Sequence, residues 1–127
     1  MSTSVKRAIV LALTIVSGLI AAAPAQAGPI IAYDSIGTPI YDTVNYRAQI
    51  CGDPSSGFTS AYVRNNLRDL APRLLVRRGQ GWFDVRGYNE AQRGAWWWYG
   101  TGHDGYGNSY NGWIFLNHIT YRDGTCH

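Results

Sequence analysis

The sequence is poor in lysine and glutamate, and this scarcity restricts the partners and chemistry that it can support. Lys6 is its only lysine and Glu90 is its only glutamate. Beyond the first ten residues, nine arginines stand against eight acidic residues, so the charge is nearly balanced. The one dense group of cations is formed by Arg73, Arg77 and Arg78. Because nucleic-acid binding needs many clustered cations, we interpret this group as a solvated strand end and expect no nucleic-acid partner.

Sequence motifs that are typical of hydrolases are also missing. No G-x-S-x-G motif provides a nucleophilic serine. A carboxylate pair for glycoside hydrolysis needs a defined separation across a cleft, and Glu90 lies in a predicted turn, six residues after Asp84. His103 and Asp104 are adjacent and His118 could join them, but a general base needs a substrate pocket. We therefore predict no catalytic residue and a protein that is not an enzyme.

Metal ligands are sparse as well. Asp104, Asn108 and Asn111 could offer oxygen atoms to calcium. Their spacing does not fit the twelve-residue calcium loop, which has alternating oxygen ligands, a central glycine and a terminal glutamate. We predict no metal site and no cofactor.

The only long apolar run lies at the N-terminus, where residues 1–27 have the features of a secretory signal peptide. Lys6 and Arg7 give a positive start, an apolar segment follows, and Ala25-Gln26-Ala27 provides a small-x-small cleavage site. A single transmembrane anchor is the alternative, but the run is shorter than the twenty or so residues that a membrane span needs. We expect residues 28–127 to be one secreted, extracellular domain without a membrane anchor.

Cysteine is limited to Cys51 and Cys126, and both lie in the expected secreted part. An even number of cysteines in an oxidising compartment predicts a disulfide between them. The alternative is that Cys51 is a nucleophile served by His103 or His118, which an extracellular location and a second cysteine argue against.

Aromatic residues are abundant, and all five tryptophans lie between residues 82 and 121. Aromatic and β-branched residues are typical of strands. In the segment that begins at Trp82, side chains alternate, so Phe83 and Val85 should face one side and Asp84 and Arg86 the other. Together with Ile114 and Leu116 from a later strand, Phe83 and Val85 are predicted to form one core.

The remaining segments are predicted as follows. Residues 28–42 read as an extended arm, with one edge strand in it as the alternative, and Thr43 to Cys51 as a strand with Val44, Tyr46, Ala48 and Ile50 on one face. Between Thr59 and Leu70, the spacing of Val63, Leu67 and Leu70 predicts a short helix, with a folded loop and a strand as the alternative. Arg73 to Arg78 should be a strand that Gly79 to Gly81 joins in a hairpin to the strand at Trp82.

Three consecutive tryptophans, Trp96 to Trp98, cannot all face one core if they lie in a strand. They are followed by Gly100 to Gly112, which is rich in Gly, Asn, Ser and Tyr and predicts a long loop. Exposed aromatic rings beside polar side chains suit sugar rings or peptide. The predicted ligand-binding residues, brought together if the loop folds back over Trp98, are Trp96, Trp98, Tyr106, Asn108, Tyr110 and Asn111.

Several of these segments, taken in order, resemble the sequence pattern of a known family. The pieces are Asp42 to Ala48, a Gly-Ser-rich loop, Gly81-Trp82-Phe83-Asp84-Val85, and Asn111-Gly112-Trp113-Ile114-Phe115. In this order they resemble the bacterial Src-homology-3-like domains from Asp42 to Tyr121. The resemblance implies a small antiparallel β barrel that binds cell-wall peptide or glycan without chemistry. The predicted helix, the tryptophan triplet and the tyrosine-bearing loop depart from that family's pattern.

Three kinds of function remain open. The first is a secreted binding module for cell-wall peptide or glycan. The second is an interaction protein, an inhibitor or toxin, whose partner is a secreted protein. The third is a small hydrolase. For the first, replacing Trp98 with alanine should weaken binding roughly ten- to hundred-fold and leave the melting temperature nearly unchanged.

Overall fold

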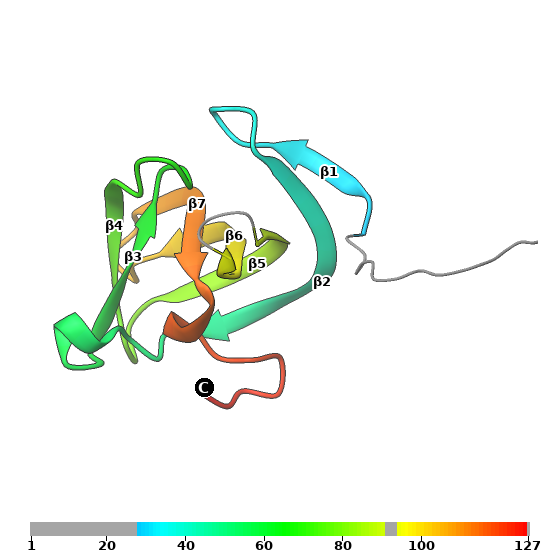
Figure 1. Ribbon diagram of the computed structural model, residues 1–127. Helices are drawn as coiled ribbons and strands as arrows, with labels where there is room; N and C mark the ends of the chain where they lie inside the picture. The colour runs from blue at the N-terminus through cyan, green and yellow to red at the C-terminus, as the bar shows by residue number, and fades with distance from the viewer. Residues whose placement is uncertain (1–27, 91–93, 127) are drawn as a thin grey trace, which may run out of the picture.

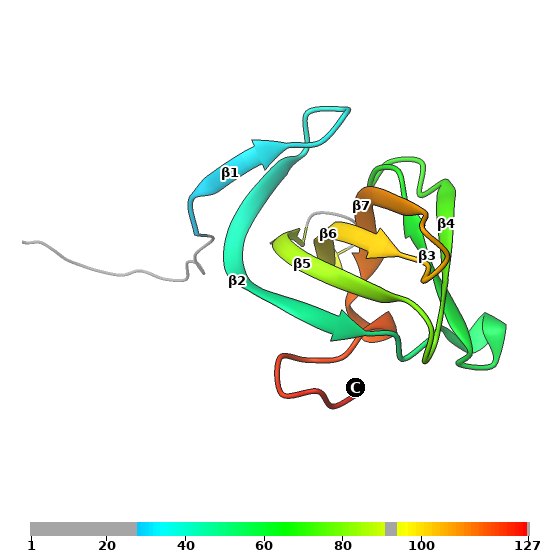
Figure 2. The same cartoon turned by 180° about the vertical axis from the view of Figure 1, so that it is seen from behind.

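The computed structural model describes residues 28–90 and 94–126, which form seven antiparallel strands curled into a half-barrel (Figures 1 and 2). The elements are β1 (Ile30–Tyr33), β2 (Pro39–Gln49), the 3₁₀ turn η3 (Pro54–Ser56), β3 (Ser60–Arg64), β4 (Pro72–Arg77), β5 (Trp82–Asn89), β6 (Trp97–His103), β7 (Ser109–Phe115) and the 3₁₀ turn η5 (Leu116–His118). Their order across the sheet is β1-β2-β5-β6-β7-β3-β4. The expected mainly β, antiparallel fold is confirmed. The predicted signal peptide lies outside the described residues.

The concave side of the sheet holds the main core, here called the inner cluster. Its buried members are Ala48, Ile50, Ala61, Val63, Val76, Phe83, Val85, Ile114 and Ile119. The predicted alternation of β5 is confirmed, since Phe83 and Val85 are buried while Arg86 is exposed. Leu116 was expected here but lies half-buried in η5, where the chain leaves the strand direction, and Ile119 takes a place in the core instead.

A second apolar group, the outer cluster, lies on the opposite face of the sheet. It consists of Ile40, Leu67, Trp97 and Trp113. The β1–β2 hairpin folds toward it, because Asp34 in the connecting turn accepts a hydrogen bond of 3.0 Å from the indole Nε1 of Trp113. The other carboxylate oxygen of Asp34 accepts bonds from the backbone N–H groups of Ile36 and Thr38. Asp34 therefore holds the hairpin turn and ties it to the sheet.

Replacing Asp34 with alanine should lower the free energy of unfolding by about 1–2 kcal/mol, because it leaves the buried indole N–H of Trp113 without an acceptor. Thermal unfolding followed by circular dichroism measures the change. Asp69→Ala is a suitable control, since that carboxylate is solvent-exposed and makes only long contacts, an ion pair of 3.9 Å with Arg68 and a 3.5 Å hydrogen bond from Asn66. A melting temperature equal to that of the wild type would show that the Asp34–Trp113 bond does not anchor the hairpin.

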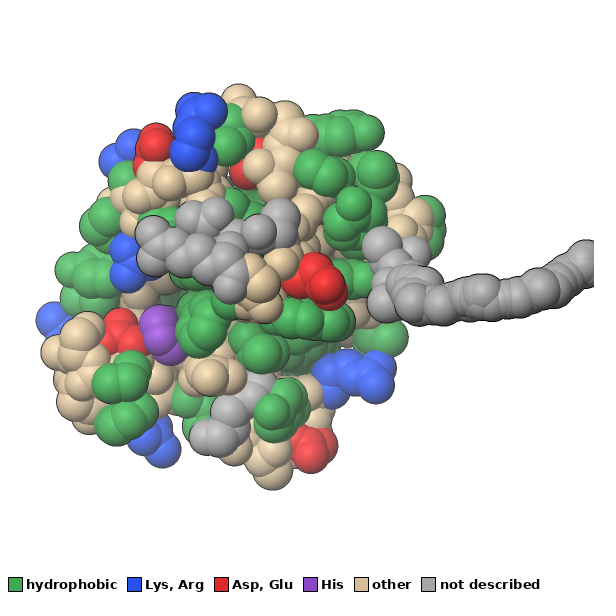
Figure 3. Space-filling model, viewed as in Figure 1, with side chains coloured by type: hydrophobic (Ala, Val, Ile, Leu, Met, Phe, Trp, Pro, Cys, Tyr) green, Lys and Arg blue, Asp and Glu red, His purple; other side chains and the backbone are tan. Residues whose placement is uncertain are grey.

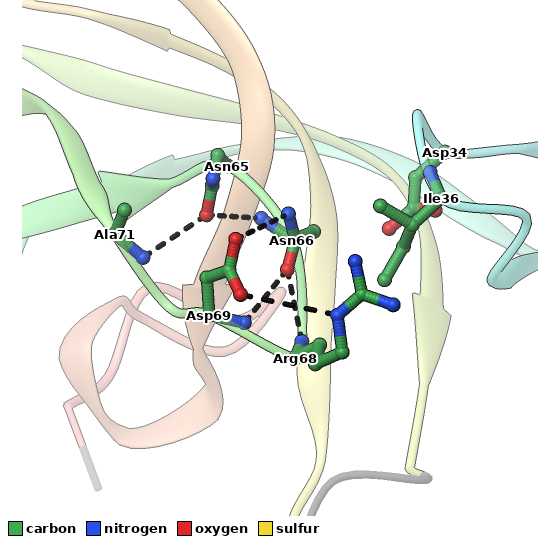
Figure 4. Close-up of polar contacts among 7 residues, drawn as sticks. All are labelled: Asp34, Ile36, Asn65, Asn66, Arg68, Asp69 and Ala71. Carbon is green, nitrogen blue, oxygen red and sulfur yellow. Dashed lines mark hydrogen bonds and ion pairs between the residues drawn. The ribbon is translucent and has the colours of Figure 1, made fainter.

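The short helix predicted between Thr59 and Leu70 is wrong, and its alternative, a strand with a folded loop, is present. Figure 4 shows why the chain turns after β3: the Asn65 and Asn66 side chains satisfy backbone donors that a helix would use internally. The Asn66 carboxamide oxygen accepts from the N–H groups of Arg68 and Asp69. Such local bonds compete with helix formation. Val63 and Leu67, predicted to share one stripe, accordingly point into different clusters.

The long loop predicted from Gly100 to Gly112 is also wrong. β6 and β7 pair throughout this region, from Trp97 opposite Phe115 to His103 opposite Ser109, and leave a turn of only five residues. The glycines in these strands permit close backbone approach rather than flexibility. A Cβ atom on Gly100 would lie 1.9 Å from the carbonyl oxygen of Asp84, and one on Gly112 would lie 2.3 Å from that of Arg64.

The hairpin predicted between residues 73–78 and 82–86 does not form. The turn itself is present, with the Arg77 carbonyl accepting bonds from the N–H groups of Gln80 and Gly81. The two strands then diverge, because β4 pairs with β3 at the edge of the sheet while β5 pairs with β2 and β6.

The end of the chain closes the half-barrel against β2. After η5, Ile119 bridges to Ile50, and the backbone N–H of Cys51 donates to the carbonyl of His118 at 2.8 Å. The predicted disulfide is confirmed and joins Cys51 to Cys126 across 75 residues. In the described part of the chain, no helix has the length and apolar character to cross a membrane.

Candidate ligand-binding site

The six residues predicted to bind ligand do not gather at one place. Trp96 directly precedes β6 and Trp98 is its second residue, whereas Tyr106 and Asn108 lie in the turn at the far end of the β6–β7 hairpin. Asp104 lies six positions after Trp98 along the extended strand, which is roughly 20 Å at about 3.3 Å per residue. The premise that the loop folds back over Trp98 is therefore wrong, because that loop is strand.

Tyr110 and Asn111 occupy opposite faces of β7. Tyr110 pairs with Gly102 and packs against the inner cluster. Asn111 accepts a 2.6 Å hydrogen bond from the hydroxyl of Thr101 on the outer face. Asn108 donates to the Asp104 carboxylate at 2.8 Å, which stiffens the turn around Tyr106.

The tryptophan triplet divides as strand alternation requires. Trp97 is buried in the outer cluster, Trp96 is 40% exposed, and Trp98 is half-buried against the inner cluster. Trp96 and Trp98 meet edge to face with ring centroids 6.0 Å apart. Tyr88 stacks on Trp96 at 4.9 Å and Tyr41 contacts Tyr88 at 5.8 Å. These four rings form a continuous aromatic cluster across β2, β5 and β6.

Beside this cluster lies an open groove of about 510 Å³. It is lined by Thr43, Val44, Tyr46, Trp98, Tyr121, Arg122 and Asp123. β2 forms one wall, the segment after Ile119 forms the other, and Trp98 reaches it from β6. Figures 1 and 2 show that this last segment runs alongside the lower half of β2.

The β2 wall is shaped by an irregularity in strand pairing. The register of β2 against β5 shifts between Asp42 and Tyr46, so the intervening residues bulge out of the ladder. As a result Val44, predicted to share a face with Ala48 and Ile50, is 55% exposed at the groove. Bulges bend a strand and redirect its side chains, which is how β2 provides both a wall and an opening.

The opposite wall is held in place by several bonds. The Tyr46 hydroxyl donates to the carbonyl of Thr120 at 2.9 Å across the base of the groove. The turn beyond it is closed by the N–H of Tyr121, which donates to the carbonyl of Thr125. The disulfide then fixes Cys126, so both ends of this wall are anchored.

The electrostatics of the groove are mixed. Burial raises the pKa of the Tyr46 phenol, and the positive charge of Arg122 offsets part of this rise. Hydrogen bonds from Thr125 hold the pKa of Asp123 below its ordinary value. An uncharged ring, a cation and an anion therefore line the groove together, which suits a polar ligand with apolar faces better than a ligand of one charge.

His103 and the neighbouring Asp104, which were considered and rejected as a catalytic dyad, have different partners. His103 Nε2 lies 3.2 Å from Asp84 Oδ2, and its ring stacks on Trp82 at 4.8 Å. Burial alone would raise the pKa of Asp84, but the hydrogen bond and charge of Arg47 outweigh this and lower it. Asp84 is thus held as a carboxylate between Arg47 and His103.

The other residues considered for chemistry are dispersed. Glu90 is exposed just after β5, and the predicted turn from Tyr88 is wrong because Tyr88 and Asn89 belong to that strand. His118 lies half-buried in η5, where burial lowers its pKa. Within residues 28–90 and 94–126, no three His, Cys, Asp or Glu side chains gather closely enough to hold a metal ion.

Sequence reasoning missed the groove residues from β2 and the C-terminal segment. Tyr46 was expected in a strand, but no local pattern places it beside Tyr121 and Arg122, which lie more than seventy residues later. The disulfide prediction was the one available signal, because it brings the C-terminus to the end of β2.

No family model, curated protein or solved structure matches this chain.

Proposed function

We propose that the chain is a secreted, non-catalytic binding module for cell-wall peptide or glycan, and that the groove at Trp98 receives the ligand. The groove itself is the observation that carries this proposal. It presents three aromatic rings, from Tyr46, Trp98 and Tyr121, beside Arg122 and Asp123. Aromatic rings stack on the apolar faces of sugars or peptide groups, while the charged and hydroxyl groups provide hydrogen bonds.

Two features support the Src-homology-3-like interpretation of the fold. The β5–β6–β7 meander is followed by the 3₁₀ turn η5 and then by a short extended segment that closes on β2. This order is compatible with the small antiparallel β barrel that the resemblance implies. The β3–β4 hairpin is an addition to that pattern, and it pairs with β7 through Arg64 and Trp113.

The disulfide supports export, since disulfides persist in oxidising compartments. The N-terminal pattern of a signal peptide points to the same location. We therefore place the function outside the cell, where cell-wall polymers are accessible.

A second candidate is an interaction protein, an inhibitor or toxin that contacts a secreted protein. The turn between β6 and β7 favours it, because Tyr106 is 72% exposed on a stiffened tip. The Asp104 carboxylate accepts bonds from the backbone N–H groups of Tyr106 and Asn108, which fixes the tip.

A sedimentation assay on purified bacterial cell wall separates the two candidates. The wild-type protein should pellet with the wall, and soluble peptide or glycan fragments should release it. Trp96→Ala should weaken retention several-fold, because it removes an exposed ring from the aromatic cluster. Tyr106→Ala is the matched control, since it removes a still more exposed ring at the far end of the hairpin.

The wild type failing to pellet would contradict the proposal. Loss of retention in Tyr106→Ala, with Trp96→Ala unaffected, would place the wall-binding surface at the tip of the β6–β7 hairpin and contradict the groove as the ligand site.

A further inference from the structure

The outer face of the sheet carries a second, smaller pocket that the groove does not include. Its volume is about 220 Å³, and it lies under the β1–β2 hairpin. Its lining includes Ile31, Ile40, Asp42, Asn45, Arg86 and Tyr99. β2 separates the two hollows, since Thr43, Val44 and Tyr46 line the groove whereas Asp42 and Asn45 line the pocket.

Two strand bulges border this pocket. The register of β2 against β5 shifts between Asp42 and Tyr46, which contains Asn45. The register of β5 against β6 shifts between Val85 and Gly87, which leaves Arg86 as the extra residue. Arg86 lies on the outer face, as the alternation after Val85 predicts, and its guanidinium carbon is 5.5 Å from the centre of the Tyr99 ring.

Gly87 lies beneath Ile40, one of the residues that line the pocket. It pairs with Asp42 and Tyr99 on the two neighbouring strands. A Cβ atom there would lie 2.4 Å from Cγ2 of Ile40 and 2.7 Å from the carbonyl oxygen of Tyr41. The absence of a side chain lets Ile40 pack closely against β5.

Arg86 is oriented but has unused donors. One of its Nη atoms donates to the hydroxyl of Thr101 at 3.3 Å, and Thr101 in turn donates to Asn111. A guanidinium has five N–H groups in a planar fork, so most of them are free to meet a ligand. A fork of this kind binds a carboxylate with two parallel bonds.

Asp42 provides the opposite charge. Within residues 28–90 and 94–126, neither Asp42 nor Arg86 forms an ion pair, although both line the same pocket. The amide of Asn45 likewise has no hydrogen-bond partner in the described part of the chain. A cation, an anion and an amide thus border an apolar floor without satisfying one another.

We propose that this pocket binds a zwitterionic amino-acid centre, with Arg86 on the carboxylate and Asp42 on the ammonium group. The pocket has less than half the volume of the groove, about 220 Å³ against about 510 Å³, which suits a small ligand such as a single amino acid. Ile31, Ile40 and Tyr99 would contact its aliphatic side chain. This site lies on the opposite face from the groove, so it stands or fails independently of the proposed function.

Titration of the purified protein with L-alanine, followed by amide chemical shifts, tests the proposal. Saturable shifts at Asp42, Asn45, Arg86 and Tyr99 are expected, with a dissociation constant of about 1 mM for so small a ligand. Blocking either charge should weaken binding at least ten-fold, so N-acetylalanine and alaninamide are the matched ligands.

Two variants test which residue binds the carboxylate of the ligand and which binds its ammonium group. Arg86→Gln should remove the preference for alanine over alaninamide, while Asp42→Asn should remove the preference for alanine over N-acetylalanine. Both side chains are on the surface, so both variants should fold, and Arg73→Gln serves as a charge control that leaves binding unchanged. The proposal is overturned if no shifts occur at an alanine concentration 50-fold above the expected dissociation constant of about 1 mM. It is also overturned if the blocked ligands bind as tightly as alanine, or if Arg73→Gln weakens binding as much as Arg86→Gln does.

Discussion

Replacing Cys51 and Cys126 together with alanine should lower the free energy of unfolding by about 4–5 kcal/mol. The disulfide joins residues 75 positions apart, and cross-linking a chain of that length removes much of the conformational freedom of the unfolded state. For a domain of this size such a loss lowers the melting temperature by roughly 20–35 °C. Alanine is preferred to serine because Cys51 is buried, and a hydroxyl there would add its own cost.

Differential scanning calorimetry with and without reductant provides the control. Wild-type protein in reductant should approach the melting temperature of the double variant, and the variant itself should not respond to reductant. The same variant should also lose ligand binding, because the disulfide anchors one wall of the groove. A double variant within about 1 kcal/mol of the wild type would contradict the entropic account of the bond.

Trp98→Ala should weaken binding to cell wall by roughly ten- to hundred-fold, since a buried aromatic contributes about 1.5–3 kcal/mol. The sequence alone suggested that stability would be unaffected, but the structure changes that expectation. Trp98 is half-buried and packs against the inner cluster. The substitution should therefore also destabilise the fold by about 2 kcal/mol, below the cost for a fully buried tryptophan.

Binding must accordingly be measured well below the melting temperature of each variant. Tyr62→Ala is a suitable control, because Tyr62 is 38% exposed on β3 and does not line the groove. It should leave retention on cell wall unchanged. Unchanged retention of folded Trp98→Ala would exclude Trp98 from the binding surface.

Exposed apolar side chains on the β1–β2 hairpin are a separate feature of the surface. Ile30, Ile31 and Tyr33 are between 45% and 62% exposed on an edge strand without charge. Figure 3 shows hydrophobic side chains gathered over this hairpin. Edge strands of this kind can pair with other chains, so binding assays on this protein need a check of its oligomeric state.

The sequence predicted best those features that depend on near neighbours or on few choices. The alternation of Phe83 and Val85 with polar residues depends only on neighbouring positions in one strand, so the structure confirms it. The disulfide followed from the presence of two cysteines only. The antiparallel β class followed from the aromatic and β-branched composition.

The errors arose where one residue type has two physical uses. Glycine favours turns, but Gly100 and Gly112 allow neighbouring strands to approach closely, so a paired hairpin was taken for a loop. The apolar spacing of Val63 and Leu67 matched a helix, but the side chains of Asn65 and Asn66 capture backbone donors and turn the chain between them.

The groove was not predictable from local pattern. It depends on a bulge in β2, on a ring from β6, and on a C-terminal segment brought close by Ile119 and the disulfide. Trp98 was identified because strand alternation sets its face. Its neighbours Tyr46 and Tyr121 are separated by most of the domain, and only the fold brings them to the same place.

The most direct test of the groove is a titration of ¹⁵N-labelled protein with soluble cell-wall fragments, observed through the indole N–H signals of its five tryptophans. The Nε1 atom of Trp98 is buried and has no hydrogen-bond partner among the described residues, whereas that of Trp113 is bonded to Asp34 on the other face. The account predicts a saturable shift of the Trp98 signal, with backbone shifts at Tyr46 and Arg122, while the Trp113 signal stays constant. Binding that leaves Trp98 unchanged, or no binding at all, would contradict it.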